Sequence, residues 1–155
     1  MDERTKQLLA LGREHYEKRD YDRAEPALIQ VLERPGKYAD VFHMLGVIHH
    51  DRGRFHEAQA AFEEALAINP NYTEAALNLA VIYNELGHYD DAMRIYRAAA
   101  GKVTSSDMDP LIKGKIANMH ARLSVAYVDA SMLEEGIAEL RKAVLLCPHF
   151  VDLRL

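Results

Sequence analysis

Apolar residues recur at helical spacing along the chain, and short polar turns interrupt them at regular distances. In the segment 39–72, one apolar stripe precedes the turn Asp51–Arg54 and a second stripe follows it. Such spacing places the apolar side chains on one face of an α-helix. Pro70 ends the second stripe, because proline cannot continue a helix. The segment therefore predicts two helices joined by a turn, and no segment shows the alternation of a β-strand.

The same pattern returns every 34 residues, with one longer step of 44 before its last occurrence. Five columns of matching residues share this period: Leu11, Leu45, Leu79, Leu123; Tyr21, Phe55, Tyr89, Leu133; Ala24, Ala58, Ala92, Gly136; Leu28, Phe62, Tyr96, Leu140; and Val31, Ala65, Ala99, Ala143. Exact recurrence favours a solenoid of helix pairs over an ordinary bundle. Gly53 and Gly87 occupy one position of the repeat, where a positive φ would stop the first helix.

These columns resemble the tetratricopeptide repeat family. Its pattern sets a bulky residue, a Leu followed by a small residue, an aromatic, Ala, a second aromatic, Ala and Pro within one repeat. The second repeat supplies these as Phe42, Leu45, Gly46, Ala58, Phe62, Ala65 and Pro70. Only one position departs from the pattern, because His49 stands where the first aromatic residue is expected. The small residues let the two helices of one repeat approach closely.

The resemblance implies an all-α fold, a right-handed α-solenoid of stacked antiparallel helix pairs, forming one domain over residues 1–155. We expect repeats at 5–38, 39–72, 73–106 and 117–150, with a ten-residue insertion between the third and fourth. Residues 151–155 would start an incomplete further helix. The abrupt end at Leu155 then indicates a truncated chain or an end that another chain covers.

The insertion predicts an unusually long helix in the fourth repeat. Asp109 and Pro110 are typical of a helix start, so the first helix of this repeat is expected from Pro110 to about Ala130. One interpretation is a tolerated loop insertion. The other is a projecting helix end that touches a partner through Met108, Leu111 and Met119.

In the family, the first helices of successive repeats line a concave groove that holds a segment of a partner protein. Carried over position by position, the groove has an apolar floor and a rim of three basic and six acidic side chains, among them Arg13, Asp40, Asp51 and Glu74. The predicted partner-binding residues are Leu9, Arg13, His43, Met44, Val47, His50, Leu77, Asn78, Val81, Asn84, Arg122 and Val125.

The net charge of the rim predicts a partner segment with apolar anchors and some basic residues, bound as a helix in a groove. Asn78 and Asn84 would bond the partner's backbone. The family's carboxylate clamp for acidic peptide ends is not expected, since only Asn78 and Arg122 match its pattern. Replacing Val47 and Val81 by Glu is expected to abolish partner capture while leaving helicity intact.

Composition and net charge argue against several classes of function. The chain has 155 residues, a mass of 17.6 kDa and a formal charge of −5. Net acidity argues against nucleic-acid binding, and the single Cys147 excludes an internal disulfide or a four-cysteine zinc site. There is no apolar run of ~20 residues for membrane insertion and no secretory signal, so we expect a cytoplasmic protein.

No motif for catalysis or for a cofactor is present. Phosphate loops, dinucleotide fingerprints and nucleophile elbows are missing, so no enzyme activity and no cofactor are expected. His49 and His50 point to different faces of a helix, which disfavours a shared metal ion, and no metal site is predicted. The leading interpretation is a non-catalytic adaptor or scaffold for protein–protein interaction. The alternatives are a self-assembling structural module, paired through its exposed apolar C-terminal end, and a fragment of a larger multidomain protein.

Overall fold

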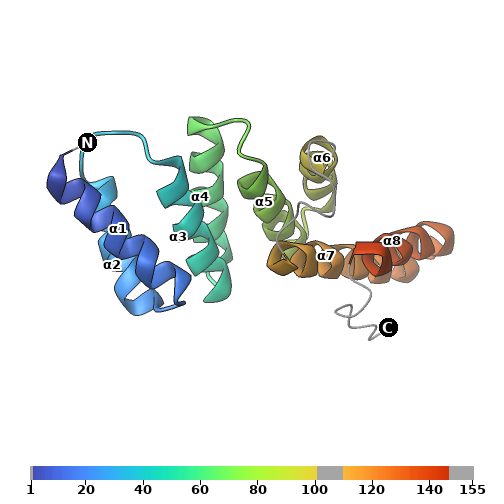
Figure 1. Ribbon diagram of the computed structural model, residues 1–155. Coiled ribbons are helices and arrows are strands. Elements are labelled where there is room, and N and C mark those ends of the chain that lie inside the picture. The colour runs from blue at the N-terminus through green and yellow to red at the C-terminus, as the bar shows by residue number, and fades with distance from the viewer. Residues whose placement is uncertain (1, 101–109, 147–155) are drawn as a thin grey trace. The chain divides into compact units, whose positions relative to one another are not determined.

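The computed structural model describes residues 2–100 and 110–146, with the side chains of Ala100 and Leu111 left aside (Figure 1). Within these ranges every regular element is an α-helix, which confirms the predicted all-α fold. The helices are α1 (Glu3–Glu17), α2 (Tyr21–Leu32), α3 (Ala39–Asp51), α4 (Phe55–Ile68), α5 (Thr73–Glu85), α6 (Tyr89–Ala100), α7 (Pro110–Asp129) and α8 (Leu133–Leu146).

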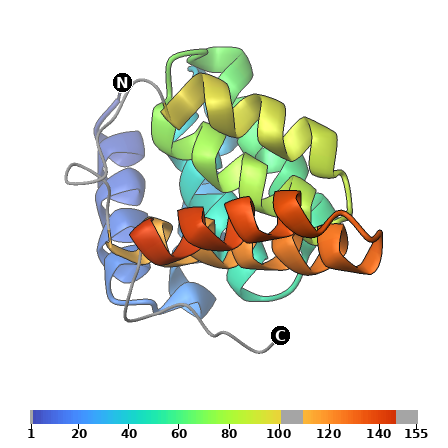
Figure 2. The ribbon, with the colours of Figure 1, turned by 90° about the vertical axis from the view of Figure 1, so that its right-hand side faces the viewer.

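The chain divides into two compact units, Met1–Ala75 and Ala76–Leu155, here called unit 1 and unit 2. In unit 1, α1 packs against α2 and α3 against α4, and α2 also contacts α3. In unit 2, α7 packs along α8, and Figure 2 shows these two helices side by side. Each unit therefore consists of packed neighbouring helices, as expected for stacked helix pairs.

The helix starts follow the repeat columns. Helices α3 and α5 begin at Ala39 and Thr73, where the sequence places the first residues of the second and third repeats. The long helix is confirmed as α7, whose 20 residues correspond to about 30 Å. Its predicted cap, Asp109, lies outside the described residues, as do the rest of the insertion at 101–109 and the end of the chain at 147–155.

The turn inside each helix pair uses one left-handed residue. Gly53 and Gly87 have φ of 74° and 81°, which confirms the positive φ predicted there. Arg19 and Ser131 hold the same position of the repeat and adopt φ of 58° and 63°. The turn geometry is thus common to all four pairs, although two of them lack the glycine that tolerates it best.

Small residues bring the two helices of a pair together. A Cβ added at Gly46 would lie 2.5 Å from the Phe62 ring, and one at Gly12 would lie 2.7 Å from Leu28. In the fourth pair, the Ser124 hydroxyl donates a 2.6 Å hydrogen bond to the Gly136 carbonyl. These contacts agree with the predicted role of the small columns in close helix approach.

Each unit has its own apolar cluster. The cluster of unit 1 includes Leu8, Leu28, Val31, Val41, Leu45 and Ile48, and that of unit 2 includes Leu77, Val81, Met93, Ile112, Ile116, Met119 and Leu123. Met119 is only 1% exposed. The prediction that Met119 is an exposed partner contact is therefore wrong, because it faces the inside of unit 2. Met108 and the side chain of Leu111 lie outside the described residues.

Candidate functional site

The predicted groove residues of unit 1 differ widely in exposure. His43, Met44 and Val47 are each 5% exposed, and Met44 belongs to the apolar cluster of this unit. Leu9 and His50 are half-buried, and Arg13 is exposed. Of the predicted floor residues in unit 1, only Leu9 therefore keeps appreciable exposed surface.

The predicted residues of unit 2 are also mostly buried. Leu77 and Val81 are 2% and 4% exposed and pack into the apolar cluster, and Asn78 and Asn84 are buried. Val125 is 37% exposed. Arg122 is exposed and forms an ion pair with Glu85 on α5. Of the six predicted floor residues in the two units, only Leu9 and Val125 offer surface to a partner.

This burial changes the expected result of one substitution. Glu at position 47 or 81 would place a carboxylate in a packed interior, which costs several kcal/mol without a paired cation. Replacing Val47 and Val81 by Glu is therefore expected to unfold the helix pairs, and the prediction that helicity stays intact is corrected. Variants that test binding have to be chosen among exposed side chains.

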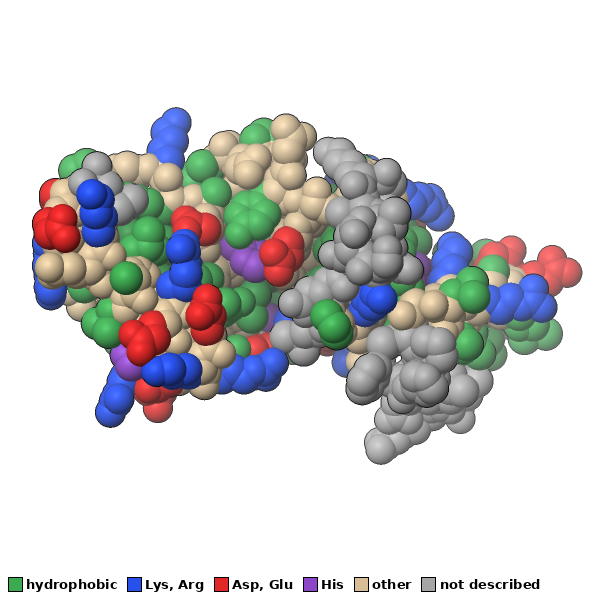
Figure 3. Space-filling view, in the orientation of Figure 1, with side chains coloured by type: hydrophobic (Ala, Val, Ile, Leu, Met, Phe, Trp, Pro, Cys, Tyr) green, Lys and Arg blue, Asp and Glu red, His purple; other side chains and the backbone are tan. Residues whose placement is uncertain are grey.

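A surface of tyrosines and carboxylates lies on unit 1. We call it the tyrosine–acid surface, and it comprises Arg13, Tyr16, Tyr21, Asp40, Asp51, Tyr72 and Glu74. The Tyr16 and Tyr21 rings stack with centroids 6.3 Å apart, and the Tyr21 hydroxyl donates a 2.7 Å hydrogen bond to Asp51. The Arg13 guanidinium donates to Asp40 at 2.5 Å. In Figure 3, hydrophobic, basic, acidic and His side chains are mixed on the left-hand part of the view, where unit 1 lies.

Tyr72 joins this surface from the loop between α4 and α5. Its ring centroid lies 5.1 Å from that of His43, which in turn lies 5.8 Å from the Phe62 ring. This aromatic stack connects the surface to the inside of the second helix pair. The sequence pattern did not single out Tyr72, because it lies between two helices and outside the five columns that define the repeat.

Carboxylates act on the tyrosines of this surface. Burial raises the pKa of the Tyr16 phenol, and the neighbouring Tyr21, Glu74 and Asp51 raise it further. Burial likewise raises the pKa of Tyr72 to about 12, with contributions from Glu74 and Asp40. The residues that define this surface carry three carboxylates and one guanidinium, and Arg52 lies beside it, 6.0 Å from the centroid of the Tyr21 ring. The phenols therefore stay protonated as hydrogen-bond donors, and the surface favours a positively charged partner.

The part of the chain that the structure describes holds neither a candidate metal site nor a helix that could span a membrane. No group of three or more His, Cys, Asp or Glu side chains in the described ranges could hold a metal ion. Among the described helices, none combines the length and the apolar character needed to cross a membrane.

Comparison with known proteins identifies the repeat. Two family models described as tetratricopeptide repeat match residues 9–58 and 49–107. A solved structure of MamA matches with a TM-score of 0.68 and 20% identity, covering 92% of this chain and 77% of that chain. A solved structure of a MamA mutant matches with a TM-score of 0.61 and 29% identity, covering 66% of this chain and 75% of that chain.

A third solved structure, YrrB, is described as a TPR protein with an unusual peptide-binding site. It matches with a TM-score of 0.69 and 22% identity, covering 94% of this chain and 70% of that chain. No match is found among curated proteins. The likeness to these structures supports the solenoid of helix pairs, and the two repeat models agree with the columns seen in the sequence. The chain belongs to the tetratricopeptide repeat family.

Proposed function

We propose that the chain is a non-catalytic adaptor that binds a segment of a partner protein on the tyrosine–acid surface of unit 1. The repeat family consists of protein-interaction modules, which supports the general class. The segment carries basic residues and apolar anchors, and the cytoplasm stays the predicted compartment. The observation behind this proposal is the pair of half-buried tyrosines, Tyr16 and Tyr72, among the charges of Asp51 and Glu74.

The chemistry of this surface suits such a segment. Tyrosine rings give large contact area together with a hydroxyl for hydrogen bonding, and for this reason they are enriched at interfaces. The half-buried Leu9 adds apolar area on α1. The carboxylates attract lysine and arginine side chains and speed their encounter with the surface. A segment whose basic residues flank apolar anchors therefore matches both the apolar contact area and the carboxylates of this surface.

A peptide library displayed on phage tests this proposal. Selection on the whole chain is expected to enrich segments that combine Lys or Arg with apolar residues. The double variant Asp51→Asn with Glu74→Gln should weaken an enriched peptide about tenfold, which corresponds to about 1.4 kcal/mol. Both side chains are exposed, so the change removes charge without disturbing the interior.

A matched control makes the same change of charge elsewhere. Glu57 and Glu64 are exposed on α4, and Glu57→Gln with Glu64→Gln should leave peptide affinity unchanged. Equal losses of peptide affinity in both double variants would mean that the net charge of the chain, and not the tyrosine–acid surface, causes the loss. Enrichment of acidic segments would contradict the proposed partner chemistry.

A second candidate function is self-assembly through α8. Its exposed face includes Leu133 at 60%, Ile137 at 43% and Leu145 at 81% exposure. Such apolar surface favours association with a second copy of the chain. Light scattering over a range of concentrations is expected to show dimers that Leu145→Asp and Ile137→Asp abolish. A mass that stays monomeric at every concentration would rule against this function.

A further inference from the structure

In unit 1, an arginine bridges the first and second repeats. The Arg52 guanidinium donates to Asp22 at 2.6 Å and to Glu25 at 2.9 Å, and it lies 6.0 Å from the centroid of the Tyr21 ring. Arg52 follows the end of α3, whereas its three partners come from the first half of α2. An arginine of one repeat is thus held by the aromatic and acidic start of the preceding second helix.

Unit 2 repeats this arrangement of partners with a different bridging residue. Tyr89 and Asp90 at the start of α6 follow Tyr21 and Asp22 by 68 residues. The position of Arg52 recurs 78 residues later as Ala130, directly after α7. The third and fourth repeats therefore keep the tyrosine and the carboxylate of this contact, and an alanine stands at the position that corresponds to Arg52.

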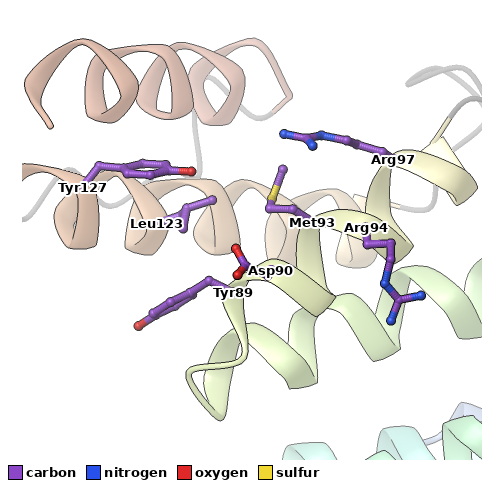
Figure 4. A pocket seen from close by; sticks show the side chains of 7 residues that line it. All are labelled: Tyr89, Asp90, Met93, Arg94, Arg97, Leu123 and Tyr127. Atoms are coloured by element: carbon purple, nitrogen blue, oxygen red, sulfur yellow. The ribbon is translucent and has the colours of Figure 1, made fainter.

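Tyr89 and Asp90 line a pocket of about 570 Å³ between α6 and α7 (Figure 4). Met93, which replaces Glu25 in the repeat, and Leu123 are 7% and 3% exposed and form an apolar floor. In Figure 4 the Asp90 carboxylate points toward α7. Within the described residues Asp90 forms no ion pair, since the nearby cation of Arg94 bonds Asp91 at 3.2 Å. The pocket thus combines one carboxylate, two tyrosine rings, an apolar floor and the basic side chains of Arg94 and Arg97.

We propose that this pocket binds an arginine side chain of a partner protein. The guanidinium stacks on Tyr89 and pairs with Asp90, as Arg52 does with Tyr21 and Asp22, while its methylene groups cover the apolar floor. Lysine fits less well, because an ammonium lacks the planar fork that pairs with a carboxylate and stacks on a ring. Arg97 lines the same pocket and repels a bound cation, so pairing with Asp90 and stacking on Tyr89 have to outweigh this repulsion.

A peptide titration that is monitored by nuclear magnetic resonance tests whether the pocket prefers arginine. The probe is the peptide acetyl-Gly-Ala-Arg-Ala-Gly-amide, and its control carries citrulline, the neutral isostere of arginine. The arginine peptide is expected to shift the amide resonances of Tyr89 and Asp90 and to bind at least about tenfold more tightly than the citrulline peptide. Asp90→Asn should remove this preference. Glu134→Gln, which changes an exposed side chain on α8 outside the pocket lining, should keep it.

Restoring the bridging residue gives a second, independent test. Ala130→Arg is expected to place the chain's own arginine in the pocket and to weaken binding of the peptide at least about tenfold. Ala130→Gln is the matched control and should bind as the parent chain does. Equal binding of the citrulline peptide, unchanged binding by the Ala130→Arg variant, or shifts confined to other residues would each overturn the proposal. Preference for a glutamate peptide would overturn it too, by making Arg97 the anchor.

The two proposals can fail separately. The arginine pocket lies in unit 2, so Asp51→Asn with Glu74→Gln in unit 1 should leave binding of the arginine peptide unchanged. Conversely, Asp90→Asn should leave the phage-selected segments bound to unit 1. Loss of both activities in one variant would indicate unfolding, which circular dichroism of the same sample detects.

Discussion

At the residue scale, the same substitution has opposite expected effects at two glycines. A Cβ at Gly53 or at Gly114 would meet no atom within 4 Å, so packing does not separate them. Gly53 has φ of 74°, where Ala is strained, whereas Gly114 lies inside α7. Gly53→Ala should cost about 1 kcal/mol of unfolding free energy, and Gly114→Ala should add about 0.5–1 kcal/mol. Urea unfolding measures both, and a loss at Gly114 would contradict this account.

A third glycine is limited by packing. A Cβ at Gly46 would approach the Phe62 ring to 2.5 Å, and Phe62 is fully buried. Because this ring has no room to move, Gly46→Ala should destabilise the second helix pair by about 1–3 kcal/mol despite its better helix propensity. Gly114→Ala serves as the control in the same urea experiment. An unchanged midpoint for Gly46→Ala would mean that α3 and α4 separate readily.

At the element scale, α7 and α8 are joined by a buried hydrogen-bonded pair. The His120 ring, 0% exposed in its side chain, donates through Nδ1 to Glu139 at 2.6 Å, and Lys142 donates to the same carboxyl group at 3.0 Å. Burial alone would raise the pKa of Glu139, but the hydrogen bonds from His120 and Lys142 outweigh it and lower the pKa below its usual value of 4.5. The pair therefore stabilises the fourth repeat with Glu139 ionised.

This pair predicts an acid-sensitive repeat. The lowered pKa means that the contribution of Glu139 is present above about pH 4.5 and is lost as the pH falls below that value. Glu139→Gln should cost about 1.5–3 kcal/mol at neutral pH and make unfolding less dependent on pH below about 4.5. Glu134→Gln, an exposed site on the same helix, is the control. A parallel pH profile in the Glu139 variant would refute the role of the pair.

The elements themselves could be predicted from the sequence, but their surfaces could not. The repeat columns predict the starts of α3 and α5, and Asp109 with Pro110 predicts the start of α7, because these signals act locally. The exposure of Met44 and Val47 depends on how closely the next helices approach, which no local pattern encodes. Tyr72 reaches His43 from a loop, so its place in the site follows from tertiary packing alone.

At the scale of the whole molecule, the stability of each unit should depend on its own cluster. Leu28 and Ile116 are fully buried and belong to separate clusters in units 1 and 2. Truncating either to Ala removes buried area worth about 2–5 kcal/mol. In a solenoid each repeat contacts only its neighbours, so this loss should stay local.

Amide hydrogen exchange on the full chain measures this directly. Leu28→Ala should lower protection in α1, α2 and α3 and leave α7 and α8 close to the parent values, and Ile116→Ala should do the reverse. The two variants act as controls for each other, because both remove a large aliphatic side chain from a buried site. Equal loss of protection in all helices would instead mean that the four helix pairs unfold as one cooperative body, and that a ligand bound at either unit stabilises the other.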